Sequence, residues 1–362
     1  MLIQRIYNSS GAKVASNIAV YTLFWLLAVA SFYNFAEAVD FESANKPYRL
    51  GRGYTFNALN LTIGGYLSID YELFENQTGR AKLDDLSLFL AWKPSRRLRF
   101  FSELELEDTF TLEGSSFHNH GSHFSVERLY ADVLLNGQTT LRIGKFLTPV
   151  GRWNVIHASP LVWTTERPLV TSTVAFPAHA SGLMLRGTVE VDEYDLDYEV
   201  YLDDTKDLDP KVDREATFQN AVGGHLNLNL SEQLQLGASY VNFRARDHLA
   251  SERFNLVGVD FLWTKNRIEL SGELIYRLGG KHDNDEKGLY AQAVIPVWKQ
   301  IYSVTRYEYY DQGDAENELH LGIAGLAYRP SPPVVFKLEY RFGHHNQNLA
   351  PSGLLASFAV LF

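Results

Sequence analysis

The sequence predicts an all-β fold, a transmembrane antiparallel up-and-down β-barrel of about 16 strands. Three observations lead to this prediction. From residue 59 onward, apolar and polar residues alternate in short segments, which is the pattern of a strand with one face in lipid. The connections between the segments are alternately short and long. The last segment stays apolar at every second position up to the terminal Phe362.

We predict sixteen strands, an even number as in bacterial barrels, with boundary errors of a few residues. The predicted strands are 59–73, 82–92, 97–108, 124–135, 139–147, 181–191, 194–203, 218–230, 233–244, 253–264, 267–278, 288–298, 301–311, 317–329, 333–343 and 353–362.

The lengths of the connections predict the orientation of the barrel. Short turns such as Asn136-Gly137-Gln138 and Asp192-Glu193 alternate with long connections. Because both termini of such a barrel lie in the periplasm, the short turns are periplasmic and the long connections are outer loops. The outer loops are 74–81, 109–123, 148–180, 204–217, 245–252, 279–287, 312–316 and 344–352.

Several strands end on an aromatic residue close to a cation, which is typical of a ring of aromatic side chains at the lipid headgroups. Examples are Trp92-Lys93 and Trp298-Lys299. Trp298 and Tyr328 are one residue out of phase with the apolar face of their strands. We therefore expect a β-bulge or a register error near each of them.

The N-terminus has the layout of a secretory signal peptide. A basic region leads into the apolar run 18–35, and small residues follow. Cleavage after Ala38 or after Ala30 fits this pattern, and an uncleaved membrane anchor is the alternative. We divide the chain into a signal peptide (1–38), a periplasmic lead-in (39–58) and the barrel (59–362).

Composition excludes several functional classes. The chain has no cysteine, so disulfides and thiolate catalysis are excluded. Its formal net charge of −10 speaks against a nucleic-acid partner. We predict no cofactor and no metal site. The histidines at 118, 120 and 123 and the acidic stretches 203–209 and 282–286 read as solvated outer loops, with divalent ion binding as the alternative.

The face opposite the apolar one is rich in charge and predicts a water-filled lumen, since sixteen strands are too many for side chains to fill. We assign pore-wall positions to Asp195, Asp197, Glu199, Arg277, Arg306 and Arg341.

The third outer loop, 148–180, is the longest connection and is too apolar to lie in water. Val150, Trp153, Ile156 and Trp163 illustrate this. We expect the loop to fold into the barrel and narrow the pore.

This architecture resembles the bacterial porins, in which an inward-folding third loop forms the constriction. The run from Arg142 to Gly151 is also similar to a segment of the phosphate-selective porin family, in which basic arrays guide anions. The resemblance implies constriction and ion-selectivity roles for Arg128, Arg142, Arg152, His157, Glu166, Arg167 and Arg186. The chain lacks a lysine-rich run near the constriction, and Glu166 sits beside Arg167.

The terminal segment, with Phe358, Val360 and Phe362, resembles the signal by which bacterial outer-membrane proteins are recognised for assembly. The resemblances imply a channel in the bacterial outer membrane for small hydrophilic solutes or ions, with a mild anion preference. The alternatives are a substrate-specific channel (phosphate, another oxyanion or sugar) and a non-conducting structural or adhesion barrel. Expected partners are outer-membrane lipid and lipopolysaccharide, the barrel assembly machinery and, by analogy, two further copies in a homotrimer. The chain has no Gly-x-Ser-x-Gly elbow, and we do not expect an enzyme.

Overall fold

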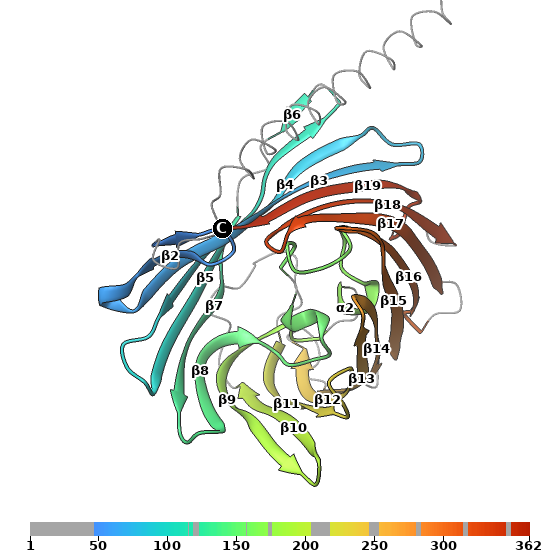
Figure 1. The fold of residues 1–362 in the computed structure, drawn as a ribbon. Coiled ribbons are helices and arrows are strands. Elements are labelled where there is room, and N and C mark those ends of the chain that lie inside the picture. The colour runs from blue at the N-terminus through green and yellow to red at the C-terminus, as the bar shows by residue number, and fades with distance from the viewer. Residues whose placement is uncertain are drawn as a thin grey trace, which may run out of the picture. The chain divides into compact units, whose positions relative to one another are not determined.

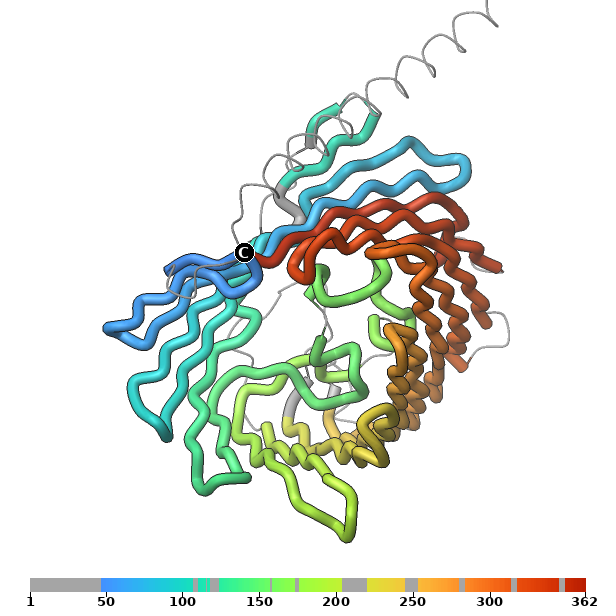
Figure 2. The backbone as a smooth tube through the Cα atoms, in the orientation of Figure 1, coloured from blue at the N-terminus to red at the C-terminus, as the bar shows by residue number. Residues whose placement is uncertain are grey.

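The computed structural model describes residues 47–114, 116–118, 123–156, 158–172, 176–203, 218–245, 253–279, 284–313, 318–344 and 349–362. In this part of the chain, sixteen strands form a closed antiparallel barrel (Figures 1 and 2). Each strand pairs with its neighbours in sequence, and β19 (Gly353–Leu361) closes the ring against β3 (Leu61–Phe74). The predicted fold class is confirmed. No helix among these residues has the length and apolar character needed to cross a bilayer.

The strand boundaries agree closely with the alternation in the sequence. Predicted strands 139–147, 194–203 and 301–311 match exactly, and the other ends differ by at most two residues apart from the end of β5. The remaining strands of the ring are β4 (Arg80–Trp92), β5 (Leu98–Glu113), β7 (His123–Leu134), β8 (Thr139–Leu147), β9 (His179–Val191), β10 (Tyr194–Asp203), β11 (Phe218–Asn229), β12 (Leu234–Ala245), β13 (Arg253–Lys265), β14 (Ile268–Leu278), β15 (Glu286–Trp298), β16 (Ile301–Asp311), β17 (Leu319–Ser331) and β18 (Val334–His344).

The predicted outer loop 109–123 is wrong in its first part. Strand β5 continues to Glu113, and the short strand β6 (Ser116–His118) pairs back against it. Phe110 and Leu112 continue the apolar alternation, and they pair with Leu83 and Ala81 of β4. The hairpin therefore extends beyond the point where the sequence turns more polar.

Residues 47–58, the described part of the predicted lead-in, contain a small hairpin. Strands β1 (Tyr48–Arg49) and β2 (Gly53–Phe56) pair with each other, and β2 pairs with the first residues of β3. A 3₁₀ turn, η1 (Asn57–Leu59), leads into β3. The predicted signal peptide lies outside the described residues.

The seam of the barrel is made by the end of the chain. The amide of Phe362 donates to the carbonyl of Gly65 at 2.8 Å, and the amide of Gly65 donates back at 2.9 Å. Recognition of this terminal segment during assembly stays a prediction.

The outer surface of the barrel is apolar. Leu88, Leu226 and Val259 are among the large apolar side chains that are about half exposed along the strands. Trp92, Trp298 and Tyr328 are exposed as well. The expected irregularities are confirmed, because the register shifts between Pro296 and Trp298 and between Tyr328 and Ser331.

The inner face is less polar than predicted. Toward the ends joined by the long connections, strands β10 to β17 carry apolar side chains that form a core with the third outer loop. From the wall these are Tyr201, Val241, Phe243, Leu256, Ile275, Tyr290 and Leu319, and from the loop they are Val150, Trp153, Val162, Val170 and Phe176. The lumen therefore combines a packed region with a polar one.

Substitution of Gly65 tests how much the closing contact between β3 and the end of the chain contributes to stability. A Cβ atom at this position would meet the carbonyl oxygen of Ser87 and the ring of Phe362. We expect Gly65→Ala to destabilise the barrel by about 1–3 kcal/mol, because the ring and backbone must move apart. The measurement is the temperature at which the folded band disappears from SDS gels. Gly322→Ala is the matched control, since its Cβ would make only ordinary contact with Phe342. Equal shifts for both variants would contradict this account of the seam.

Candidate functional site

The third outer loop, between β8 and β9, lies inside the ring of strands (Figure 2, green). It contains a 3₁₀ turn, η2 (Trp153–Val155), and one short helical turn, α2 (Leu169–Ser172), which contacts β14, β15 and β16. Two polar side chains stabilise its base. Thr148 donates its hydroxyl to the carbonyl of Pro177 at 2.6 Å, and Asn154 donates its amide to the carbonyls of Thr148 and Ala178.

The first half of the loop is held by one buried carboxylate. Glu273 of β14 accepts the backbone N–H groups of Arg152 at 2.9 Å and Trp153 at 2.6 Å, and the hydroxyl of Tyr290 at 3.1 Å. Only 3% of Glu273 is exposed. A charged acceptor that collects several donors in a water-poor site makes strong hydrogen bonds, so Glu273 fixes where the loop enters the lumen.

The second half is held by a row of charged residues on β16 and β18. Lys337 donates to the carbonyls of Ser159 and Thr164, both at 2.9 Å. Glu308 accepts the N–H of Leu169 at 2.6 Å, and Glu339 accepts that of Thr165 at 3.0 Å. Arg306 donates to the Thr164 hydroxyl and to the Glu166 carbonyl. Because most of these bonds go to loop backbone, the wall fixes the path of the loop.

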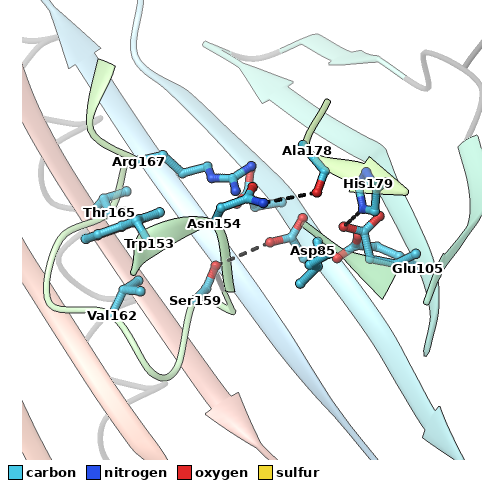
Figure 3. A pocket seen from close by; sticks show the side chains of 13 residues that line it. Asp85, Glu105, Trp153, Asn154, Ser159, Val162, Thr165, Arg167, Ala178 and His179 are labelled. Atoms are coloured by element: carbon cyan, nitrogen blue, oxygen red, sulfur yellow. Dashed lines mark hydrogen bonds and ion pairs between the residues drawn. The ribbon is translucent and has the colours of Figure 1, made fainter. Parts of the chain in front are cut away.

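A cavity of about 300 Å³ lies between the loop and the wall formed by β4, β5 and β7 (Figure 3). The strand side supplies Asp84, Asp85, Glu105 and Glu127, and the loop side supplies Trp153, Asn154, Ser159, Val162, Thr165 and Arg167. Leu147, Ala178 and His179 complete the lining.

The cavity is unequally charged. Four carboxylic side chains line it, against the cation of Arg167 and the imidazole of His179. His179 Nε2 lies 2.8 Å from Glu127 Oε1, and Glu105 accepts hydroxyl hydrogen bonds from Tyr66 and Ser87 at 2.7 and 2.9 Å. Asp85 links the two sides, since it accepts the Ser159 hydroxyl at 3.3 Å (Figure 3).

Two β-bulges bring the acidic residues to the cavity. Where β4 pairs with β3, the register shifts so that β4 has one extra residue between Leu83 and Leu86, and the adjacent Asp84 and Asp85 both reach the cavity. A second shift opposite Glu103 and Leu104 leaves Glu127 as the extra residue of β7. A bulge places neighbouring residues on one face, which strict alternation cannot predict. Sequence reasoning missed Asp84 and Glu127 for this reason, whereas Asp85 shares the inward parity of its strand and could have been found.

The arginines predicted for the constriction have separate partners. Arg128 forms an ion pair with Glu103, Arg142 pairs with Asp132 at 2.7 Å, and Arg186 lies 3.3 Å from Glu199. Arg152 donates to Gln235 at 2.9 Å and lies 3.8 Å from Asp260. Of the predicted residues that the structure describes, only Arg167 lines the cavity. Their roles in the constriction and in ion selectivity stay predictions.

Several other predicted positions have structural contacts. Glu166 pairs with Arg341, and Arg306 pairs with Glu308 at 2.6 Å, so Arg306 and Arg341 lie buried at the loop instead of on an open pore wall. Arg277 pairs with Glu286 at 2.7 Å.

The acidic positions of β10 stay on the lumen side. Asp197 accepts hydrogen bonds from Thr188 and Asn229, the backbone carbonyl of Asp195 accepts one from Asn229, and Glu199 faces Arg186. His157 lies outside the described residues. Among the residues that are described, no group of three or more His, Cys, Asp or Glu is arranged to hold a metal ion.

Comparison with known proteins supports the fold. No family model matches the chain. An uncharacterized protein of Aquifex aeolicus (strain VF5) is 28% identical over 134 residues, which is 36% of this chain and 28% of that protein's length. The match thus spans less than a third of that relative.

The solved structures that resemble the chain include bacterial outer-membrane porins. OmpF of Salmonella typhi, in complex with daunomycin, has a TM-score of 0.60 at 12% identity and covers 84% of this chain and 97% of its own. An anion-selective porin from Comamonas acidovorans has a TM-score of 0.59 at 14% identity, covering 83% and 99%. OmpT of Vibrio cholerae, in a trimer form, has a TM-score of 0.56 at 12% identity, covering 83% and 99%. At these identities the likeness establishes the fold.

Glu273 tests how the loop is anchored. We expect Glu273→Ala to release the first half of the loop, because Arg152 and Trp153 lose their common acceptor at a cost of about 1–3 kcal/mol for the groups left unpaired. Limited trypsin digestion followed by mass spectrometry measures this as faster cleavage after Arg152, since the bond between Arg167 and Pro168 resists trypsin. Glu232→Ala, in an exposed turn between β11 and β12, is the control and leaves the cleavage rate unchanged. Unchanged cleavage in Glu273→Ala would show that other contacts hold the loop.

Proposed function

We propose that the chain is a porin, a channel in the outer membrane through which small hydrophilic solutes and ions diffuse passively. One observation carries the proposal: a closed sixteen-stranded ring holds an inward loop, and a polar cavity lies between that loop and the wall. A ring of this width exceeds what side chains fill, and its apolar outer surface suits lipid.

The proposed location is the outer membrane of a Gram-negative bacterium. Lipid and lipopolysaccharide are the partners of the apolar outer surface, and the barrel assembly machinery is the partner of the terminal segment. We also propose a homotrimer. The trimer form of the similar Vibrio cholerae protein supports this assembly by analogy.

The contacts favour a weak cation preference, opposite in sign to the expectation from the sequence. Acidic side chains outnumber cations around the cavity. Arg128, Arg142 and Arg186 each face a carboxylate, which cancels most of their field at a distance. Charges around a narrow passage set the ion preference, so the carboxylates beside the loop are the proposed determinants. Specificity for phosphate or another oxyanion has less support, because Arg167 is the one arginine among the described residues that line the cavity.

Conduction is the first test. The purified full chain in a planar bilayer should give discrete conductance steps, and liposomes that contain it should swell in solutes up to a size limit. A general pore admits solutes by size alone, whereas a specific channel for sugar or an oxyanion favours one class. Intact barrels that insert without conducting would contradict the channel and favour a structural or adhesion barrel.

Charge substitution is the second test. We expect Asp85→Asn to lower the cation-to-anion permeability ratio about twofold, and Arg167→Gln to raise it by a similar factor, since each removes one charge from the passage. Reversal potentials in a KCl gradient give the ratio. Glu232→Gln, in an exposed turn, is the control. A wild-type preference for anions would refute the proposed sign.

A further inference from the structure

We propose that the cavity beside the third outer loop binds zwitterionic solutes of amino-acid size. The ammonium group would lie at the carboxylates of the strand wall, and the carboxylate group at Arg167. This inference rests on the proposed channel function and adds a substrate class to it.

The two sides of the cavity carry opposite charge. Asp85 and Glu105 come from the strand wall, and Arg167 comes from the loop (Figure 3). Glu127 of β7 lines the cavity from the same wall. No ion pair or hydrogen bond joins the Arg167 side chain to any other described residue. A guanidinium that faces a polar cavity without a protein partner offers two parallel donors to a carboxylate.

Two buried loop residues beside Arg167 have unused polar atoms. Asn154 is fully buried and lines the cavity, and its Oδ1 atom has no hydrogen-bond partner among the described residues. Trp153, 6% exposed, also lines the cavity, and its Nε1–H group is equally without a partner there. Leaving a buried donor and a buried acceptor unsatisfied is costly. Both atoms are enclosed in the structure, so a polar ligand gains these bonds when the side chains turn toward the cavity.

The remaining lining residues and the cavity volume limit the size of the ligand and favour an apolar part between its two charged groups. Leu147 and Val162 are buried apolar side chains of the lining, next to the indole of Trp153. About 300 Å³ is at the lower end of the range for small-molecule sites. The space suits one amino acid with an aliphatic side chain and is small for an oligosaccharide.

Charge excludes the simpler ligand classes. A free anion would meet Arg167 but also the carboxylates of Asp85, Glu105 and Glu127, which repel it. A simple cation would leave Arg167 without a partner. A solute with both charges satisfies both sides of the cavity.

The test compares three compounds with the same side chain: leucine, leucinamide, which lacks the carboxylate, and N-acetylleucine, which lacks the ammonium and is larger by an acetyl group. Isothermal titration calorimetry on the detergent-solubilised full chain measures binding without requiring conduction. We expect leucine to bind about tenfold more tightly than either analogue, since each lost charge removes one charge-assisted contact.

Variants assign each charge to its side of the cavity. Arg167→Gln should lower the affinity for leucine about tenfold and leave the affinity for leucinamide unchanged. Asp85→Asn should lower the affinity for both compounds. Arg96→Gln is the matched control: Arg96 is exposed in the short turn between β4 and β5, away from the cavity lining, and its substitution should leave the order of affinities intact.

The outcomes separate this inference from the channel proposal. If the protein conducts but binds the three compounds equally or not at all, the zwitterion site is refuted and the channel stands. If leucine binds with the expected order and the protein does not conduct, the site is supported and the channel is refuted. If Arg167→Gln lowered the affinities for leucine and leucinamide equally, the role of Arg167 would be refuted.

Discussion

The closing pairing of β19 with β3 is the constraint on which the rest of the structure depends. A strand surrounded by lipid has no water to satisfy its backbone, so every N–H and C=O group must find a neighbouring strand. The paired amides and carbonyls of Gly65 and Phe362 complete that ring at its last residue. An enclosed interior exists only because the ring is closed, and the inward loop and its cavity exist only within that interior.

The sequence was sufficient for the barrel because the signal repeats. Each strand alternates between lipid and lumen, and each connection is alternately short and long, so an error in one segment is corrected by the next. The exceptions are local. Strand β5 continues through Phe110 and Leu112 because β4 is long enough to pair with it, and such a property of a partner strand is not visible in β5 itself.

The candidate site was less predictable, for two physical reasons. Asp84 and Glu127 reach the cavity through bulges, and a single inserted residue leaves no mark on the average alternation. The partners of the predicted arginines were not foreseen, because alternation assigns a side chain to a face but not to a partner. Arg142 does face inward, yet Asp132 on the adjacent strand pairs with it. Which charges stay unpaired is decided by register.

The way the third outer loop is anchored has a consequence for how such a protein changes over generations. Wall side chains such as Glu273 and Lys337 form hydrogen bonds to backbone N–H and C=O groups of the loop, which do not depend on the identity of most side chains. Substitutions of the loop side chains that face the cavity therefore leave many of these anchoring hydrogen bonds intact. Point mutations in the loop can thus change which solutes the protein accepts, while the barrel and the path of the loop stay the same.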